Sequence, residues 1–508
     1  MSRLYNARVR FRKLVQPVVL IPLLAFFARI LPGPRTIDDA YITFRYAQNL
    51  LSNQGFVYNP GEAVLGTTTP LFALILTLIG AVLGTADAFP IIAPIISALA
   101  DAIACFLLIR IGESLRSPKS GYAAALIWAV APMSVTFAIG GMETSFFIML
   151  MLATFYFHSS HRPVLAALTG AFSLLTRPDA LLFLIPIGMD RSWAWIRKKP
   201  ERPSWLEVGV FFVPIAIWII IGTNAYGNPI PHSVMAKVNA YILPPEAGLI
   251  RLLQHYGTPF LGHLTFGNVW IGIGLILFTA LYALGSITIL KTKIHAWPIM
   301  IYPIVYLLAF SIANPLIFRW YLVPPLPIFF LGIFAGTQRL FDDLKLPVLN
   351  YVFIAAAFLM TLNGWQIRPE HGPDRPAPEM AYIKLELLYQ EAASILTERD
   401  LTNETIAAGD IGAVGYFTNA HILDTIGLIS PVSLKYYPLP DSLYTINYAI
   451  PPDLILDHMP DYIVILEVYG RNGLLVNESF LNSYRLLKKI PTDMYGSDGL
   501  LIFERSAS

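Results

Sequence analysis

Long apolar runs recur between residues 14 and 363, and they constrain the fold of this chain more than any other feature. A helix needs about 20 apolar residues to cross the hydrocarbon core of a bilayer, where every backbone hydrogen bond must be satisfied internally. The chain is 56% hydrophobic and 13% charged, whereas an average soluble domain carries about 25% charged residues. The sequence therefore predicts a polytopic α-helical membrane protein with eleven transmembrane helices, at 14–31, 88–110, 120–139, 142–158, 163–176, 178–190, 205–222, 264–290, 297–314, 319–337 and 346–363.

Lysine and arginine in short loops predict the orientation of such a protein, because they favour the cytoplasmic side. With eleven spans, the basic segments all fall on one side: the amino terminus, 110–119, 190–203 and 291–293. The apolar stretch 67–84 is expected to be a helix that lies along the outer interface or dips into it, since counting it as a span would move 110–119 outside. No small-residue cleavage site follows the first run, so we expect this run to be a retained membrane anchor.

The composition changes after residue 363, which indicates a second domain. The stretch EHGPDRPAPE at 370–379 is typical of a linker. Beyond it the chain alternates helix-like and strand-like runs, at 380–398, 405–409, 461–468 and 499–504. We therefore expect a transmembrane domain over 1–363, with a first outer loop at 32–87, and an extracytoplasmic α/β domain over 364–508.

The first outer loop opens with the polar sequence TIDDAYITFRYAQNLL at residues 36–51. On helical spacing Asp38, Arg45 and Asn49 share one face, and Tyr41 lies beside Arg45 at i, i+4. A carboxylate, a cation and an amide would then project from one side of an amphipathic helix at the outer membrane surface. The alternative is that Asp38 or Asp39 only caps this helix, where a negative charge complements the helix dipole.

Several short motifs occur in order along the chain: DDAYITFRYAQNL, GFVYNPGE and TTPL in the first outer loop, then GGMET at 140–144, LTRPD at 175–179, YGNPIP at 226–231, FRWYLVP at 318–324 and GDIGAVGY at 409–416. As an ordered set they resemble the GT-C superfamily of polyprenyl-phosphate-sugar glycosyltransferases. The closest likeness is to the mycobacterial terminal arabinofuranosyltransferases and, more distantly, to the aminoarabinose and protein mannosyl transferases. Leu65 and Thr67 depart from the pattern, because a Glu or Tyr is more usual in that stretch.

The resemblance implies an inverting transfer, in which an acceptor hydroxyl attacks the anomeric carbon of a sugar carried on a lipid phosphate. Such a reaction needs a base for the hydroxyl and cationic groups for the leaving phosphate. By the matching motif, Asp38 is the predicted base, and Asp39 positions the acceptor or shares that role. Glu143 is predicted to bind sugar hydroxyls, and Arg319 to bind the lipid phosphate bidentately.

Further substrate-binding predictions rest on charge and position. Arg45 and Lys237 are predicted as additional contacts for the lipid phosphate. Tyr41 lies beside Arg45 and is predicted to bind substrate with it. Arg177 falls between two short spans, where a charge needs a partner such as Asp179; this pair is either functional or purely structural. Asp101, inside the span 88–110, has the same two interpretations.

No cofactor is predicted with certainty. His158 and His161 lie far from the carboxylates, which argues against a metal site between them, while a divalent cation at Asp38 and Asp39 stays open. Gly272 and Gly274 lie inside an apolar run with no strand before them, so they indicate helix packing and not nucleotide binding. The expected partners are a polyprenyl-phosphate-sugar donor, a glycan, lipid or protein acceptor, and the bilayer. The net charge of +2 gives no sign of nucleic acid.

Other functions also fit parts of the pattern. A polytopic transporter or lipid flippase would use Asp101 as a coupling site and the turn at Arg177 as a helix break. Against that alternative stand the absence of inverted repeats and the carboxylates gathered in one outer loop. A scaffold that binds glycan and an oligosaccharide ligase or polymerase also stay open.

Overall fold

The computed structural model describes residues 16–198, 202–260, 267–365, 383–401 and 403–506. The chain divides into two units, and each gathers segments that are far apart in the sequence. Unit 1 comprises residues 1–35, 91–216 and 245–380, and unit 2 comprises 36–90, 217–244 and 381–508. The division into domains at residue 363 therefore stays a prediction, because the units cut the chain at other places.

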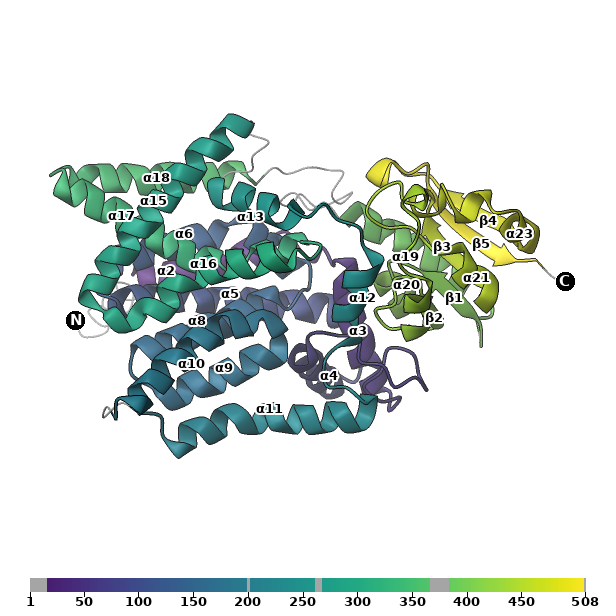
Figure 1. The fold of residues 1–508 in the computed structure, drawn as a ribbon, viewed down its shortest axis with the longest axis horizontal. Helices are drawn as coiled ribbons and strands as arrows, with labels where there is room; N and C mark the ends of the chain where they lie inside the picture. The colour runs from purple at the N-terminus through teal and green to yellow at the C-terminus, as the bar shows by residue number, and fades with distance from the viewer. Residues whose placement is uncertain (1–15, 199–201, 261–266, 366–382, 402, 507–508) are drawn as a thin grey trace, which may run out of the picture. The chain divides into compact units, whose positions relative to one another are not determined.

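Every apolar run predicted as a span coincides with helical structure over its described residues (Figure 1). The helices are α2 (Pro17–Ile30), α5 (Phe89–Ser114), α6 (Pro118–Val130), α7 (Pro132–Ile139), α8 (Thr144–Ser159), α9 (Pro163–Thr176), α10 (Leu181–Ile196), α11 (Trp205–Tyr226), α15 (Asn268–Thr292), α16 (Trp297–Ala313), α17 (Leu326–Asp343) and α18 (Pro347–Asn363). Among the described residues, five helices are long and apolar enough to cross a membrane, or six if the bent pair α6 and α7 is one span. The chain is thus a helical membrane protein, and the total of eleven spans stays a prediction.

The span predicted at 120–139 is broken in the middle. Helices α6 and α7 meet at an angle of 50°, with Ala131 between them in an extended conformation and Pro132 as the first residue of α7. Proline has no N–H to donate and disfavours a helical residue before it, so a helix breaks here. The break frees carbonyl groups at the end of α6 for other donors.

Glycines let α15 pack closely on its neighbours in unit 1 (Figure 1). A Cβ on Gly274 would lie 1.9 Å from the backbone oxygen of Gly257, the last residue of α13 (Ala247–Gly257). A Cβ on Gly285 would lie 2.0 Å from the backbone oxygen of Gly332 in α17. Both positions require glycine because backbone touches backbone, as is common between membrane helices.

Unit 2 combines helices from residues 36–90 and 217–244 with a five-stranded sheet of order β2-β1-β3-β5-β4. The strands are β1 (Thr405–Ala408), β2 (His421–Asp424), β3 (Tyr462–Leu466), β4 (Tyr484–Ile490) and β5 (Leu500–Arg505). Strands β1, β2 and β3 are parallel, while β5 pairs antiparallel with both β3 and β4. The strand-like runs predict β1, β3 and β5, but the sequence prediction missed β2 and β4.

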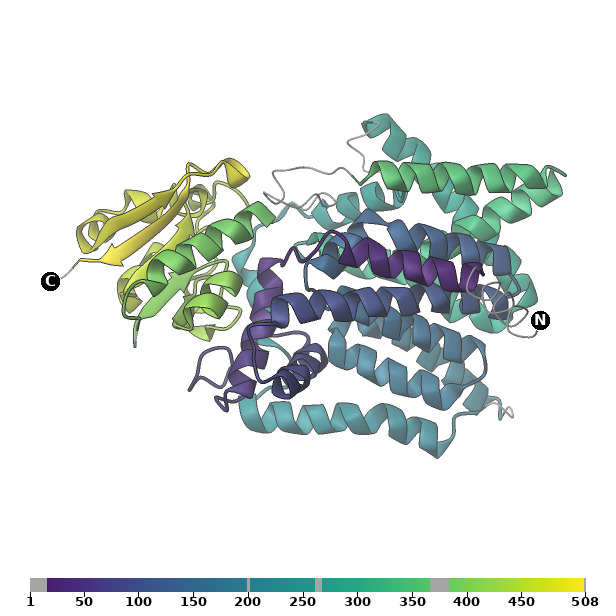
Figure 2. The ribbon, with the colours of Figure 1, turned by 180° about the vertical axis from the view of Figure 1, so that it is seen from behind.

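Unit 2 also contains helices. They are α3 (Asp38–Leu51), α4 (Pro70–Leu83), α12 (His232–Ala240), α19 (Ile383–Thr397), α20 (Gly412–Thr418), α21 (Pro452–His458), α22 (Glu467–Gly470) and α23 (Glu478–Ser483). Helix α20 packs against both α3 and α19, and α19 lies along one face of the sheet (Figure 2). The polar helix α3 near the start of the chain therefore packs with elements from the far end of the sequence.

Candidate active site

Asp38 is the first residue of α3 and is only 6% exposed. Its two carboxylate oxygens accept hydrogen bonds from the backbone N–H groups of Gly412 and Ala413, each at 2.8 Å. Those N–H groups belong to the first turn of α20, whose unpaired donors favour a negative partner. Gly412 permits this approach, because a Cβ there would lie 1.9 Å from the backbone oxygen of Asp38. Asp38 therefore joins α3 to α20 and does not cap its own helix.

Two further carboxyl groups lie beside Asp38 inside unit 2. Glu386 on α19 accepts the backbone N–H of Asp38 at 2.9 Å. Asp410 accepts the hydroxyl of Tyr389 at 2.5 Å. Burial, then the charge of Asp410, raises the pKa of Asp38 to about 8, although the two N–H bonds oppose the shift.

Burial also raises the pKa of Asp410 to about 6, and it raises the pKa of Glu386 well above its usual range. Three carboxyl groups this close cannot all be ionised in a buried site, so they titrate as one coupled group. We expect this cluster to hold at least one proton at pH 7.

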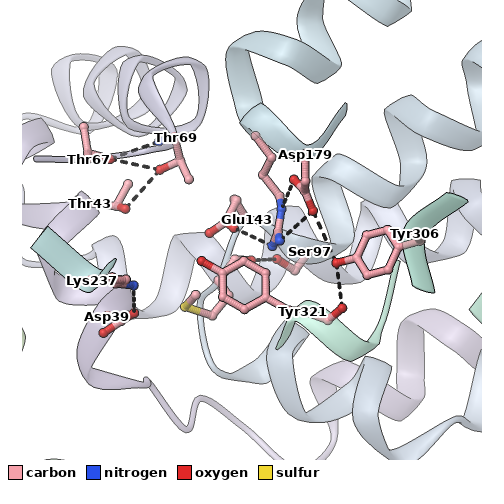
Figure 3. Close-up of polar contacts among 12 residues, drawn as sticks. Asp39, Thr43, Thr67, Thr69, Ser97, Glu143, Asp179, Lys237, Tyr306 and Tyr321 are labelled. Carbon is pink, nitrogen blue, oxygen red and sulfur yellow. Dashed lines mark hydrogen bonds and ion pairs between the residues drawn. The ribbon is translucent and has the colours of Figure 1, made fainter. Parts of the chain in front are cut away.

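Asp39 lies next to Asp38 but in a different environment. Its side chain is 30% exposed, and one carboxylate oxygen lies 3.8 Å from the Nζ atom of Lys237 on α12 (Figure 3). Successive helical residues point about 100° apart, which places one aspartate in the protein and its neighbour toward solvent. Of the two carboxylates, only that of Asp39 is open to an incoming hydroxyl.

Arg45 and Tyr41 contribute to the packing of α3 on α20. The Arg45 guanidinium donates to the backbone oxygens of Tyr58 at 3.3 Å and Asn419 at 3.1 Å, and also to the side chains of Gln48 and Asn419. The Tyr41 hydroxyl accepts from Gln390, and its ring packs against Tyr416 and Phe417. Both side chains are buried. The structure therefore gives both side chains protein partners, while their contacts with substrate stay predictions.

Three threonine hydroxyls form a second polar group in unit 2. Thr69 Oγ1 lies 3.1 Å from that of Thr43 on α3 and 3.2 Å from that of Thr67 (Figure 3). All three residues are buried, and their bonds hold the chain that enters α4 against α3. Thr67, which departs from the family pattern, thus has a partner within its own unit.

In unit 1, Arg177 is buried at the turn between α9 and α10. Its guanidinium binds Asp179 bidentately, with both N–H···O distances 2.9 Å, and donates to Glu143 at 3.1 Å. The Tyr306 hydroxyl donates to the backbone oxygen of Tyr321 at 2.7 Å and lies 3.4 Å from Asp179 (Figure 3). The pairing of Arg177 with Asp179 that the sequence predicts is confirmed, and Glu143 belongs to the same cluster.

Arg319 lies close to this cluster along the chain. It opens the short 3-10 helix η3 (Arg319–Leu322), and it is half-buried. The same turn carries Tyr321, whose ring contacts the Arg177 guanidinium at 5.1 Å and whose backbone oxygen binds Tyr306. Trp320 between them is buried and stacks on Phe318. The turn is thereby fixed on both sides of Arg319.

Asp101 in α5 has a full set of partners in unit 1. Its carboxylate accepts from Arg29 on α2 at 2.6 Å, from Ser145 at 2.7 Å and from Trp128 at 3.0 Å. Neither charged side chain of the ion pair is exposed. Ser97, one turn earlier, donates to the backbone oxygen of Met142 at 3.2 Å (Figure 3). Asp101 is therefore closed inside the helix bundle and not open to a transported ion.

Known proteins that resemble this chain were found by structure and, for one segment, by a family model. A model described as Domain of unknown function (DUF8728) matches residues 380–503. No curated protein matches the sequence. The crystal structure of ArnT from Cupriavidus metallidurans bound to undecaprenyl phosphate is similar over 97% of this chain and 98% of that chain, at 11% identity and a TM-score of 0.58.

Structures of an archaeal enzyme also match. The Archaeoglobus fulgidus oligosaccharyltransferase in complex with zinc and sulfate is similar over 96% of this chain and 73% of that chain, at 11% identity and a TM-score of 0.54. The same enzyme, AglB, in complex with an inhibitory peptide and a dolichol-phosphate gives a TM-score of 0.53 at 10% identity, over 97% and 74% of the two chains. Both neighbours are GT-C glycosyltransferases. The chain has the GT-C fold.

Within this GT-C fold, the predicted site residues separate into two groups. Unit 2 holds the residues on α3 and Lys237, while unit 1 holds Glu143, Arg177 and Arg319. The sequence interpretation missed Glu386 and Asp410 as neighbours of Asp38. Sequence interpretation could have identified Asp410, because the motif GDIGAVGY contains this residue. Glu386 lies on an ordinary amphipathic helix, and nothing in the sequence around it indicates a functional site.

Among the described residues of the GT-C fold, no group of three His, Cys, Asp or Glu side chains is placed to hold a metal ion. Asp38 gives both carboxylate oxygens to backbone N–H groups, and Asp39 lies beside an ammonium group. This donor set does not fit a dedicated cation cage, which needs several free oxygen ligands.

Proposed function

We propose that this protein is an inverting GT-C glycosyltransferase that moves a sugar from a polyprenyl-phosphate donor to an acceptor in the cell envelope. The observation that carries the proposal is the fold, which matches ArnT over nearly the full length of both chains. That structure contains undecaprenyl phosphate, and the archaeal neighbour is described with a dolichol-phosphate. A lipid-linked donor for this chain follows by analogy.

The proposal includes the arrangement in the membrane. Eleven spans would place residues 32–87, 223–263 and 364–508 on the outer face of a bacterial or archaeal cytoplasmic membrane. The acceptor could then be a glycan, a lipid or a protein on that face. The sugar, whether a hexose or a pentose, is set by contacts that the sequence motifs do not identify.

Asp39 is the base that best suits this reaction. As the acceptor oxygen bonds to the anomeric carbon, the bond from that carbon to the phosphate oxygen breaks and its electron pair stays on the phosphate. The proton of the acceptor hydroxyl passes to a carboxylate, which must be both ionised and reachable. Asp38, predicted from the motif to be the base, is buried with both oxygens already bonded, so we assign it a positioning role.

Cationic groups complete the proposed mechanism. Lys237 lies beside Asp39 and is partly exposed, so its ammonium group can stabilise charge on the leaving phosphate. Arg319 is a second phosphate contact, held on the fixed turn η3. Arg177 keeps the Glu143 carboxylate in place, and Glu143 in turn is proposed to bind sugar hydroxyls. Arg45 and Tyr41 act indirectly, by holding α3 against α20.

The deciding experiment measures transfer of labelled sugar by the purified full-length protein. The donors are a panel of polyprenyl-phosphate monosaccharides that includes the host's own lipid carrier, and the acceptor is crude cell envelope. We expect Asp39→Asn to lower kcat at least about 100-fold, the lower range for loss of a general base. The control Glu391→Gln removes an exposed carboxylate from α19 in the same unit and should leave kcat unchanged.

The results of this assay distinguish between Asp38 and Asp39 as the base and between a transferase and a transporter. Full activity of Asp39→Asn would refute its role as base, and loss of activity only in Asp38→Asn would return that role to Asp38. Absence of transfer from every donor would refute the transferase proposal and favour the transporter alternative. Adding EDTA to the same assay tests a requirement for a divalent cation.

A further inference from the structure

A cavity of about 330 Å³ lies in unit 1, away from the cluster around Arg177. It is bordered by the ends of α8 and α10, the start of α11 and the short turn η2 (Ile294–Ala296) that precedes α16. In Figure 1 the last residues of α10, the first residues of α11 and the turn between α15 and α16 lie at the same end of this unit. The sequence places its basic loops here, so this end is the predicted cytoplasmic side.

The deep part of the cavity is built around Asp190. Its carboxylate accepts the Trp297 indole N–H at 2.9 Å, and His158 Nε2 and His295 Nδ1 lie 3.6 and 3.5 Å from it. The His158 side chain is 7% exposed, and its Nε2 atom has no hydrogen-bond partner within the described residues. A buried polar atom without a partner is costly, and such atoms are commonly satisfied by a ligand or water.

The outer part of the cavity carries two arginines. Arg191 binds Glu207 on α11 bidentately, with both distances 2.8 Å, which uses this carboxylate fully. Arg202 and His161 line the mouth and are exposed. Neither side chain has a hydrogen-bond partner within the described residues.

The balance of donors and acceptors identifies the chemical class of the ligand. Both carboxylates of the lining already have cationic or N–H partners, so they offer little to a cation. The groups that remain to bind a ligand include His158, His161, His295 and Arg202, and all are donors of hydrogen bonds in a suitable protonation state. Arginine with histidine in a concave site of this size suits a tetrahedral oxyanion.

We propose that this cavity binds a phosphate group, carried either by a phospholipid headgroup or by a free phosphate compound. The site stands apart from the proposed sugar transfer, because none of its lining residues takes part in that mechanism. Bound phosphate would bridge Arg202, which lies shortly before α11, to His158 on α8, and so tie these two helices of unit 1 together.

Two probes distinguish the sources of phosphate. Native mass spectrometry of the full-length protein in detergent measures binding of palmitoyl-oleoyl phosphatidylglycerol against the diacylglycerol with the same acyl chains. Equilibrium dialysis with radiolabelled inorganic phosphate measures the free anion. The test variant is Arg202→Gln with His161→Gln, and the control is Arg162→Gln with Arg197→Gln, two exposed arginines at the same end that do not line the cavity.

We expect the test variant to weaken binding at least about tenfold, because two charge-assisted hydrogen bonds are lost. The control should stay within about twofold of the wild type. Ala194→Leu, which fills the cavity without a change of charge, should weaken binding as well. If the protein binds phosphatidylglycerol more tightly than diacylglycerol and does not retain inorganic phosphate, the ligand is a phospholipid headgroup. If the protein retains inorganic phosphate and the lipid competes with it, the ligand is a free phosphate compound. Equal binding of diacylglycerol, equal losses in test and control variants, or no binding of either probe would overturn the proposal.

Discussion

Replacing Gly412 by alanine should separate α3 from α20. The added Cβ would lie 1.9 Å from the backbone oxygen of Asp38 and 2.7 Å from its Oδ2 atom. Relief to an ordinary contact needs a movement of about 1.5 Å. Both hydrogen bonds from α20 to the Asp38 carboxylate are 2.8 Å long, so such a movement would break them.

The magnitude follows from those two bonds. Because the Asp38 carboxyl keeps its proton at pH 7, each of the two bonds joins neutral groups and contributes about 0.5–1.5 kcal/mol. We therefore expect the contact between the helices to weaken by about 2 kcal/mol. Amide hydrogen exchange of a peptide covering residues 410–418, followed by mass spectrometry, should then be about 30-fold faster than in the wild type. Thermal unfolding of the purified protein should also begin at a lower temperature.

Gly188→Ala in α10 is the matched control, because a Cβ at that helical position meets nothing within 4 Å. Its effect should be within about 1 kcal/mol of the wild type, in the stabilising direction. Unchanged exchange of the 410–418 peptide in Gly412→Ala would refute the view that Asp38 depends on this close approach.

Three more predictions concern the carboxyl cluster around Asp38, the ion-pair cluster around Arg177, and Lys237 beside Asp39. The folded chain keeps protons on Asp38 and Asp410 that the unfolded chain releases above about pH 4. The free energy of unfolding should therefore be highest below about pH 4 and fall as pH rises toward 8, by about 1.4–2 kcal/mol per pH unit near pH 6–7 in a thermal unfolding series; a flat profile would contradict the shared-proton cluster. Arg177→Met leaves two buried carboxylates without their cation and should cost about 3–5 kcal/mol, seen as a lower unfolding temperature, with Arg177→Lys recovering only part. Lys237→Gln should lower kcat/KM for the lipid donor about tenfold without changing that unfolding temperature, and an unaltered kcat/KM would remove Lys237 from the mechanism.

The helical part of the fold could be predicted because apolar runs are a local signal. All eleven runs coincide with helices, and even the break near Pro132 falls where proline chemistry requires one. The missed strands carry weaker patterns. Strand β2 has only four residues, HILD, and β4 has the sequence YRLLKKI with most of its interior side chains exposed, so neither shows a clear alternation.

The site was harder to predict because its contacts join distant segments. An aspartate at the start of a helix indicates a cap, and the sequence could not say that Asp38 binds a helix 374 residues further along the chain. Arg177 and Asp179 were identified because both partners lie in one turn, whereas Glu143, 34 residues away, was predicted for another role. Arg45 faces the side expected from helical spacing, but spacing alone does not tell whether that side meets substrate or protein.

The buried arginine of α2 has a consequence for how the chain is made. Arg29 binds Asp101 in α5, donates to the carbonyl oxygens of Ala129 and Trp128 freed by the break after α6, and shares its network with Ser134 and Ser145. All of these partners are synthesised after it. At about 5–20 residues per second, a ribosome needs several seconds to pass from Arg29 to the last of them. During that interval the first membrane segment carries an unmatched positive charge, so the newly made chain must keep α2 at the membrane surface or beside a helper protein until the later helices arrive.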